Sequence, residues 1–198
     1  MNVTIDDIKK LKELTGVGLT DAKKALVEAE GDFDKALSAM RKKGLTRAEK
    51  KGDREAREGL IDSYVHSGRI GVLVEVNCET DFVARTDGFK ALVHEIALQV
   101  AAMAPVYVSE ADVPAVELER IRDEAKARVI AEGKSAELAD KIVDGQVKKY
   151  FAEKVLLNQT YIKNEKQTVE DFLKENISIL GENLIIRQFK RIELGVSE

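Results

Sequence analysis

Apolar side chains in the first 45 residues recur at helical spacing in three short stretches. Thr4 and Asp32 precede the first and third stretches as capping residues, and Gly16, Gly31 and Gly44 follow the three stretches as stops. We therefore predict three helices, which form a domain too small to be strongly stable by itself. The side chains expected to face inward are Ile5, Ile8, Leu11 and Leu14 in the first helix, Ala22, Ala25, Leu26 and Ala29 in the second, and Phe33, Ala36, Leu37 and Met40 in the third.

A two-residue alternation predicts a β-hairpin further along the chain. Its strands are residues 59–65 and 69–78, and His66-Ser67-Gly68 forms the turn, where glycine supplies the unusual backbone angles. In the second strand, valines occupy every second position from Val72 to Val76. The hairpin is therefore expected to supply two strands of a sheet.

The pattern then returns to helical spacing. Residues 89–103 carry the strongest helical pattern, which ends before Pro105, and further helices are predicted at residues 114–132 and 135–155, the latter with Ser135 as its cap. The apolar side chains of the first of these helices are Phe89, Leu92, Val93, Ile96, Ala97, Val100 and Met103, and those of the last are Leu138, Ile142, Val147 and Phe151.

A last helix at residues 168–180 and a last strand at residues 182–194 complete the prediction. The strand can join the hairpin, so we predict an α+β fold in which helices cover a three-stranded antiparallel sheet. The expected division is residues 1–44 for the three helices, 45–57 for a basic linker and 58–198 for the core. Such a sheet keeps an open edge unless another element or chain covers it.

The connector at residues 41–57 holds eight basic residues against three acidic ones. Its simplest interpretation is a solvated linker with a helical start. The functional alternative is an electrostatic handle for an acidic partner surface.

Composition narrows the classes of function. The chain has 198 residues, of which 44% are hydrophobic and 34% charged, with a net charge of −4. This composition is typical of a globular protein, and the acidic balance argues against nucleic acid as a direct partner. No apolar run approaches the about 20 residues of a membrane span, and the N-terminus lacks the apolar segment of a signal peptide. The single cysteine, Cys78, excludes an intrachain disulfide and suits a reducing cytoplasm.

Motifs for catalysis and for cofactors are missing from the sequence. It contains no P-loop, HExxH, CxxC or GxSxG motif, and too few soft ligands for a structural zinc site. His66 and His94 have no evident nucleophile beside them, so His66 is better interpreted as a contact residue on an exposed turn. We therefore expect no enzyme activity, no catalytic residue, no metal and no cofactor.

Residues 71–85, GVLVEVNCETDFVAR, combine a valine-rich strand with an acid-aromatic end at Asp81-Phe82. From the residues alone, the simpler interpretation is an ordinary helix cap whose phenyl ring lies in the core. The alternative is a rigid strand that presents a carboxylate and a ring to a partner.

Three stretches together resemble the elongation factor Ts family of translation. They are LKELTGVGLTDAKKAL at residues 11–26, RIGVLVEVNCETDFVAR at residues 69–85 and the basic RAEKKG at residues 47–52. The resemblance extends nearly end to end, and the two longer stretches together are highly specific.

The resemblance implies a guanine-nucleotide exchange factor for elongation factor Tu. Such a factor binds elongation factor Tu with GDP, disturbs its Mg²⁺ site and promotes GDP release so that GTP can load. The three helices would be a domain similar to ubiquitin-associated domains, docking on the GTPase domain. The segment that inserts there would be Thr80, Asp81, Phe82 and Val83. The other partner contacts carried over by resemblance are Lys12, Leu19, Lys51 and His66, with Lys12 and Leu19 where family members often have Arg and Met.

Longer members of the family have two core subdomains and a coiled-coil insert, whereas this chain has room for one core subdomain. We therefore expect a short form that homodimerises through its sheet and binds two copies of elongation factor Tu. Two alternatives stay open. One is a binding adaptor without exchange activity, and the other is an RNA-binding, ribosome-associated factor that uses residues 41–57. The net charge and the aromatic content of 5% disfavour the second.

Overall fold

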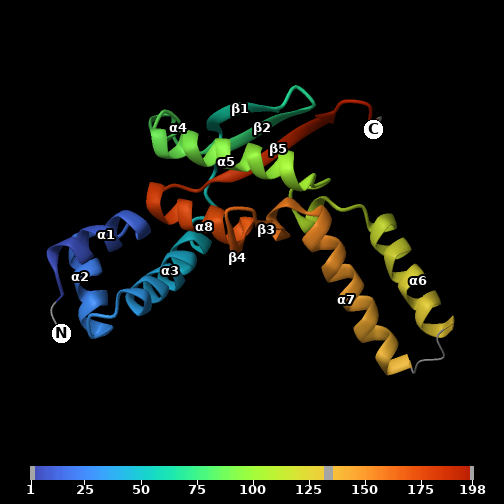
Figure 1. The fold of residues 1–198 in the computed structure, drawn as a ribbon, viewed down its shortest axis with the longest axis horizontal. Coiled ribbons are helices and arrows are strands. Elements are labelled where there is room, and N and C mark those ends of the chain that lie inside the picture. The colour runs from blue at the N-terminus through green and yellow to red at the C-terminus, as the bar shows by residue number, and fades with distance from the viewer. Residues whose placement is uncertain (1–2, 132–135, 197–198) are drawn as a thin grey trace. The chain divides into compact units, whose positions relative to one another are not determined.

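The computed structural model describes residues 3–131 and 136–196, so the expected cap Ser135 lies outside the described residues (Figure 1). The chain forms two compact units. The first comprises Met1–Ser63, Val74–Ile96 and Asp171–Arg187, and the second comprises Tyr64–Leu73, Ala97–Glu170 and Gln188–Glu198. Each unit therefore combines segments far apart in the sequence.

The three N-terminal helices are confirmed as α1 (Ile5–Thr15), α2 (Leu19–Glu28) and α3 (Phe33–Glu49). Thr4 and Asp32 cap α1 and α3, since their side chains accept hydrogen bonds from backbone N–H groups three residues later. The helices share one apolar core. Its buried members are Leu11, Val17, Ala22, Ala25, Leu26, Ala36 and Met40.

Two details of that prediction are wrong. Ile5 and Leu14 are exposed, because the buried stripe of α1 continues from Leu11 to Thr15, one helical turn later. Helix α3 also continues five residues past Gly44. This glycine is buried where α3 approaches Ser178 of α8 (Val169–Leu180), and an added Cβ would lie 3.2 Å from the Ser178 hydroxyl. Gly44 therefore serves close packing rather than helix termination.

The predicted sheet is present. Strand β2 (Ile70–Cys78) lies between β1 (Glu58–His66) and β5 (Ile185–Glu193), all antiparallel (Figure 1). Every second residue of β2 from Val72 to Cys78 is buried, as the valine alternation predicted. The last strand, however, begins at Ile185 and not at residue 182.

The hairpin turn is one residue tighter than predicted, because His66 is the last residue of β1. Ser67 and Gly68 have φ angles of 50° and 66°, and the Arg69 N–H donates to the His66 carbonyl at 2.9 Å. Two positive φ angles in succession are the signature of a type I′ turn, whose twist matches that of the strands.

The remaining helices are α5 (Asp87–Met103), α6 (Ala115–Ala131) and α7 (Ala136–Lys154), close to the predicted ranges. The stripe of α5 is buried except for Met103, and α6 packs along α7 as a helical hairpin (Figure 1). Elements too short for a periodic pattern were not predicted. They are α4 (Asp81–Ala84), β3 (Thr160–Tyr161), β4 (Asn164–Thr168) and the 3₁₀ turns Glu110–Asp112 and Leu156–Asn158.

Two buried glutamines hold the second unit together. The Gln159 side-chain amide donates to the carbonyls of Glu153 at 2.9 Å and Met103 at 3.3 Å. The Gln99 amide donates to the Gln159 side-chain oxygen at 3.2 Å and to the Thr160 carbonyl at 3.1 Å. The two Gln159 bonds satisfy carbonyls in the last turns of α5 and α7, where helices leave their last carbonyls without partners.

Candidate partner-binding site

The segment at residues 80–83 comprises the cap and most of the single turn of α4 (Asp81–Ala84), shortly after β2 ends at Cys78. Thr80 caps this turn, since its hydroxyl accepts a hydrogen bond from the Val83 N–H at 3.4 Å. The Phe82 side chain is 80% exposed, while Val83 is half-buried. The interpretation of Phe82 as a core ring is therefore wrong, and the ring that is buried nearby is Phe89, which is 0% exposed.

An ion pair lies beside the Phe82 ring. An oxygen of the Asp81 carboxylate lies 2.8 Å from the Arg85 guanidinium, one helical turn later. Arg85 is largely exposed, so the pair contributes little to stability and can open at low cost. The tip, formed by residues 80–83, therefore offers an exposed phenyl ring. Next to this ring it offers a carboxylate that can leave Arg85 for another partner.

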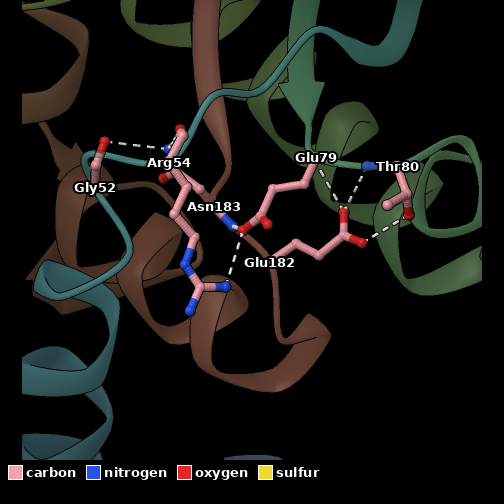
Figure 2. Close-up of polar contacts among 6 residues, drawn as sticks. All are labelled: Gly52, Arg54, Glu79, Thr80, Glu182 and Asn183. Carbon is pink, nitrogen blue, oxygen red and sulfur yellow. Dashed lines mark hydrogen bonds and ion pairs between the residues drawn. The ribbon is translucent and has the colours of Figure 1, made fainter.

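The base of the tip is held by Glu182, from the segment just before β5 (Figure 2). One oxygen of its carboxylate accepts hydrogen bonds from the N–H groups of Glu79 and Thr80, both at 3.0 Å. The other oxygen accepts from the Thr80 hydroxyl at 2.6 Å. Hydrogen bonds to an ionised acceptor are stronger than neutral ones, so these three bonds fix the residue that caps α4.

Asn183 contacts Glu79 through its backbone and the end of the basic connector through its side chain (Figure 2). Its backbone N–H donates to the Glu79 carboxylate at 2.7 Å, and that carboxylate lies 3.5 Å from the Arg54 guanidinium. Its side chain is buried, and the amide donates to the carbonyls of Arg54 at 2.7 Å and Gly52 at 3.2 Å. Asn183 therefore joins the end of the basic connector to the base of the tip.

The other predicted contact residues are spread over the chain. Lys12 is exposed in the last turn of α1, and Leu19, 53% exposed, begins α2. Lys51 is half-buried and directly precedes Gly52, so it lies beside the bonds that Asn183 makes. His66 belongs to the second unit, where its ring nitrogen lies 2.9 Å from the Tyr64 hydroxyl.

Comparison with known proteins decides the family. The family model described as Elongation factor TS matches residues 44–196. The elongation factor Ts of Thermoanaerobacter sp. (strain X514) is 52% identical over 194 residues, which cover 98% of this chain and 95% of the relative. This chain belongs to the elongation factor Ts family. The elongation factor Ts of Coprothermobacter proteolyticus is 50% identical over 98% of this chain and 100% of its own length, and that of Herpetosiphon aurantiacus is 45% identical over 98% and 99%.

Membership of the elongation factor Ts family implies the role of nucleotide-exchange factor for elongation factor Tu. Within residues 3–131 and 136–196, no helix is both long and apolar enough to cross a membrane. The same described residues contain no cluster of three or more His, Cys, Asp or Glu side chains that could hold a metal ion.

Sequence reasoning missed Glu182 and Asn183, because it placed both in the last strand. The available signal was Gly181, which adopts a positive φ of 82° directly after α8. A polar Glu-Asn pair between such a glycine and an apolar strand indicates a connecting segment whose side chains are free to bind neighbouring backbone.

Cys78 lies beneath the tip, and its thiol donates to the Thr80 carbonyl at 3.1 Å. Burial, reinforced by the negative charge of Glu182, raises the pKa of the Cys78 thiol from 9.0 to about 11. Since the thiolate is the nucleophile, this cysteine is an inert packing group.

We expect Cys78 to react with a disulfide reagent at pH 8 at least about a hundredfold more slowly in the native protein than in urea, since so little of it is thiolate. The unfolded chain loses this proton first, so the contribution of the thiol to stability is complete below pH 9.0 and lost as the pH approaches about 11. Labelling kinetics, followed by absorbance, check the first point. Equal labelling rates for native and unfolded protein would contradict it.

Proposed function

We propose that this chain accelerates GDP release from elongation factor Tu by inserting Phe82 into its GTPase domain. One observation carries the proposal, namely a phenyl ring that is 80% exposed at the braced end of the central strand. Exposing such a ring to water is unfavourable, and a partner that covers it regains that free energy. Family membership supplies the partner. By this mechanism Asp81 and Phe82 disturb the Mg²⁺ site, GDP leaves and GTP loads.

The energetics require more than one contact. The factor and GDP must weaken each other's binding equally, because the coupling between the two sites is reciprocal. Burying one phenyl ring contributes about 1.5–3 kcal/mol, which is roughly ten- to a hundredfold in an equilibrium constant. A larger acceleration needs the other contacts. We assign these to Lys12 and Leu19 on the N-terminal helices, to Lys51 on the connector and to His66 at the hairpin.

The proposed role involves no chemical step, so this chain needs no catalytic residue and no cofactor of its own. The nucleotide and Mg²⁺ belong to elongation factor Tu. We place the reaction in the cytoplasm, where translation elongation takes place.

The decisive experiment measures release of a fluorescent GDP analogue from elongation factor Tu in the presence of excess unlabelled GDP. We expect the rate to rise and saturate as this protein is added. Binding without acceleration would favour the adaptor alternative. The absence of both binding and acceleration would remove the proposal altogether.

We further propose that the chain homodimerises through its sheet and forms a complex of two copies with two of elongation factor Tu. The support is a set of exposed apolar side chains in the second unit, three on its strands and one directly after β5. Monomeric proteins rarely leave contiguous apolar surface uncovered. The residues are Val65, Leu73, Ile192 and Leu194, all more than half exposed.

We expect Leu73→Asp to raise the dissociation constant of the dimer by at least about a hundredfold, because an unpaired buried charge costs several kcal/mol. Light scattering across micromolar concentrations measures the change. Ile130→Asp is the matched control, since Ile130 is an equally apolar, 75% exposed residue of α6 outside the strands. A wild-type protein that is strictly monomeric at these concentrations would contradict the dimer.

A further inference from the structure

Two pairs of neighbouring residues, 79–80 and 182–183, exchange hydrogen bonds although they lie 103 positions apart in the chain. The Glu182 carboxylate accepts from the backbone of Glu79 and Thr80, and the Glu79 carboxylate accepts from the backbone of Asn183 (Figure 2). We propose that Glu182 and Asn183 are positioning residues, which fix the direction in which the Phe82 side chain projects from the turn that follows β2. This inference rests on the proposed exchange function.

Glu182 reaches the tip through Thr80. A helix of four residues has almost no stability of its own, so the orientation of α4 depends on its cap. The Thr80 hydroxyl donates to Glu182 and accepts from the Val83 N–H, so it connects the carboxylate with the far side of the turn. Without Glu182, Thr80 loses two hydrogen bonds and Glu79 loses one. The turn then keeps its own cap bond and its connections to β2 and α5, but it loses its attachment to the segment before β5.

Glu182 and Asn183 together form a brace at the base of the tip. Through Asn183 this brace also reaches the segment that carries a second proposed contact residue, Lys51. The Asn183 amide holds the carbonyls of Gly52 and Arg54, directly after Lys51. The segments that carry Lys51 and Phe82 are therefore both bound to the neighbouring residues Glu182 and Asn183, the first through the buried Asn183 amide and the second through the Glu182 carboxylate. The two contacts should reach the partner together, so the loss of one should alter the effect of the other.

The brace matters for exchange more than for binding. A ring on a loose turn can still be covered by the partner, but part of the interaction energy then goes into ordering the turn. Displacing a nucleotide, by contrast, requires the ring to enter the GTPase domain in one fixed orientation. A loosened tip should therefore slow GDP release within the complex and change the concentration for half-maximal effect much less.

The test compares Glu182→Ala and Glu182→Gln with wild type in the GDP-release assay. We expect Glu182→Ala to lower the maximal rate by about tenfold, the effect of losing charge-assisted hydrogen bonds, and to change the half-saturating concentration by less than about threefold. Glu182→Gln should restore most of the rate, because its amide oxygen can accept the two backbone bonds. The matched control is Gln159→Ala, which also removes a side chain that makes two hydrogen bonds to the backbone, in this case to carbonyls of the second unit.

Native-state amide exchange gives a readout that does not need the partner. In Glu182→Ala the N–H groups of Glu79 and Thr80 should exchange at least about tenfold faster through local opening, while that of Val74 in the middle of β2 should keep its wild-type rate.

For Asn183, the experiment measures the energetic coupling between Lys51 and Phe82. The effects of Lys51→Ala and Phe82→Ala on the maximal rate should be non-additive in wild type and additive in the Asn183→Ala background. Non-additivity that persists without Asn183 would remove its role.

The outcomes separate the two proposals. If Phe82→Ala slows release but Glu182→Ala stays within about twofold of wild type, the positioning role is overturned and the proposed function stands. An equal loss in Gln159→Ala would also overturn it, by showing a general effect of stability. A wild-type protein that never accelerates release would overturn the proposed function, and the positioning role with it.

Discussion

Phe82→Ala is expected to lower the maximal rate of stimulated GDP release by at least about tenfold, the lower end of what one buried ring contributes. The free energy of unfolding should stay within about 0.5 kcal/mol of the wild-type value, as for other exposed positions. The reason is the 80% exposure of the ring, which leaves few contacts to lose in the free protein. In the complex the same ring would be covered.

Release of fluorescent GDP and urea denaturation measure the two quantities on the same preparation. Phe82→Leu is the informative control, since it keeps apolar bulk and should retain more of the rate than Phe82→Ala. Parallel losses of rate and stability would show that the ring supports the fold, and would falsify its role as a wedge.

Phe89→Ala is expected to have the opposite profile and to lower the free energy of unfolding by about 3–5 kcal/mol, the usual cost of emptying a buried phenyl site. Phe89 is 0% exposed at the start of α5, seven positions after Phe82. The rate of exchange per folded molecule should change little, because this ring does not reach the surface.

Urea denaturation with an unchanged slope against concentration checks the stability loss. The rate is compared at a temperature where both proteins are folded. A loss of under about 1 kcal/mol would mean that the core around α5 collapses onto the gap, contrary to the close packing of this helix.

Most elements of the fold followed from local periodicity. Valines at alternate positions of β2 and the helical stripe of α5 each require one buried face, and tertiary packing supplied it. Prediction was wrong where one residue allowed two outcomes. Gly44 could end a helix or allow close approach, and only the position of α8 decided between them. The strand β5 begins three residues later than predicted, because an apolar pattern does not register what a side chain such as Glu182 binds.

The candidate site shows the same limit. The sequence identified the segment from Thr80 to Val83 and, by resemblance, its family. It did not decide whether Phe82 is a core ring, since a phenyl at the start of a helix suits both a core and a contact surface. That choice depends on which other elements pack over the turn. Glu182 was equally out of reach, because its partners lie 103 and 102 positions away.

By itself, the sequence determined the order of the longer helices and strands, most of their buried positions, the absence of catalytic motifs and the resemblance to a family of translation factors. Those properties depend on residues close together in the chain. Only the tertiary structure decided that the phenyl ring of Phe82 faces solvent and that Glu182 and Asn183 brace its base. Exposure and long-range hydrogen bonds are properties of segments brought together by folding, and no local pattern encodes them.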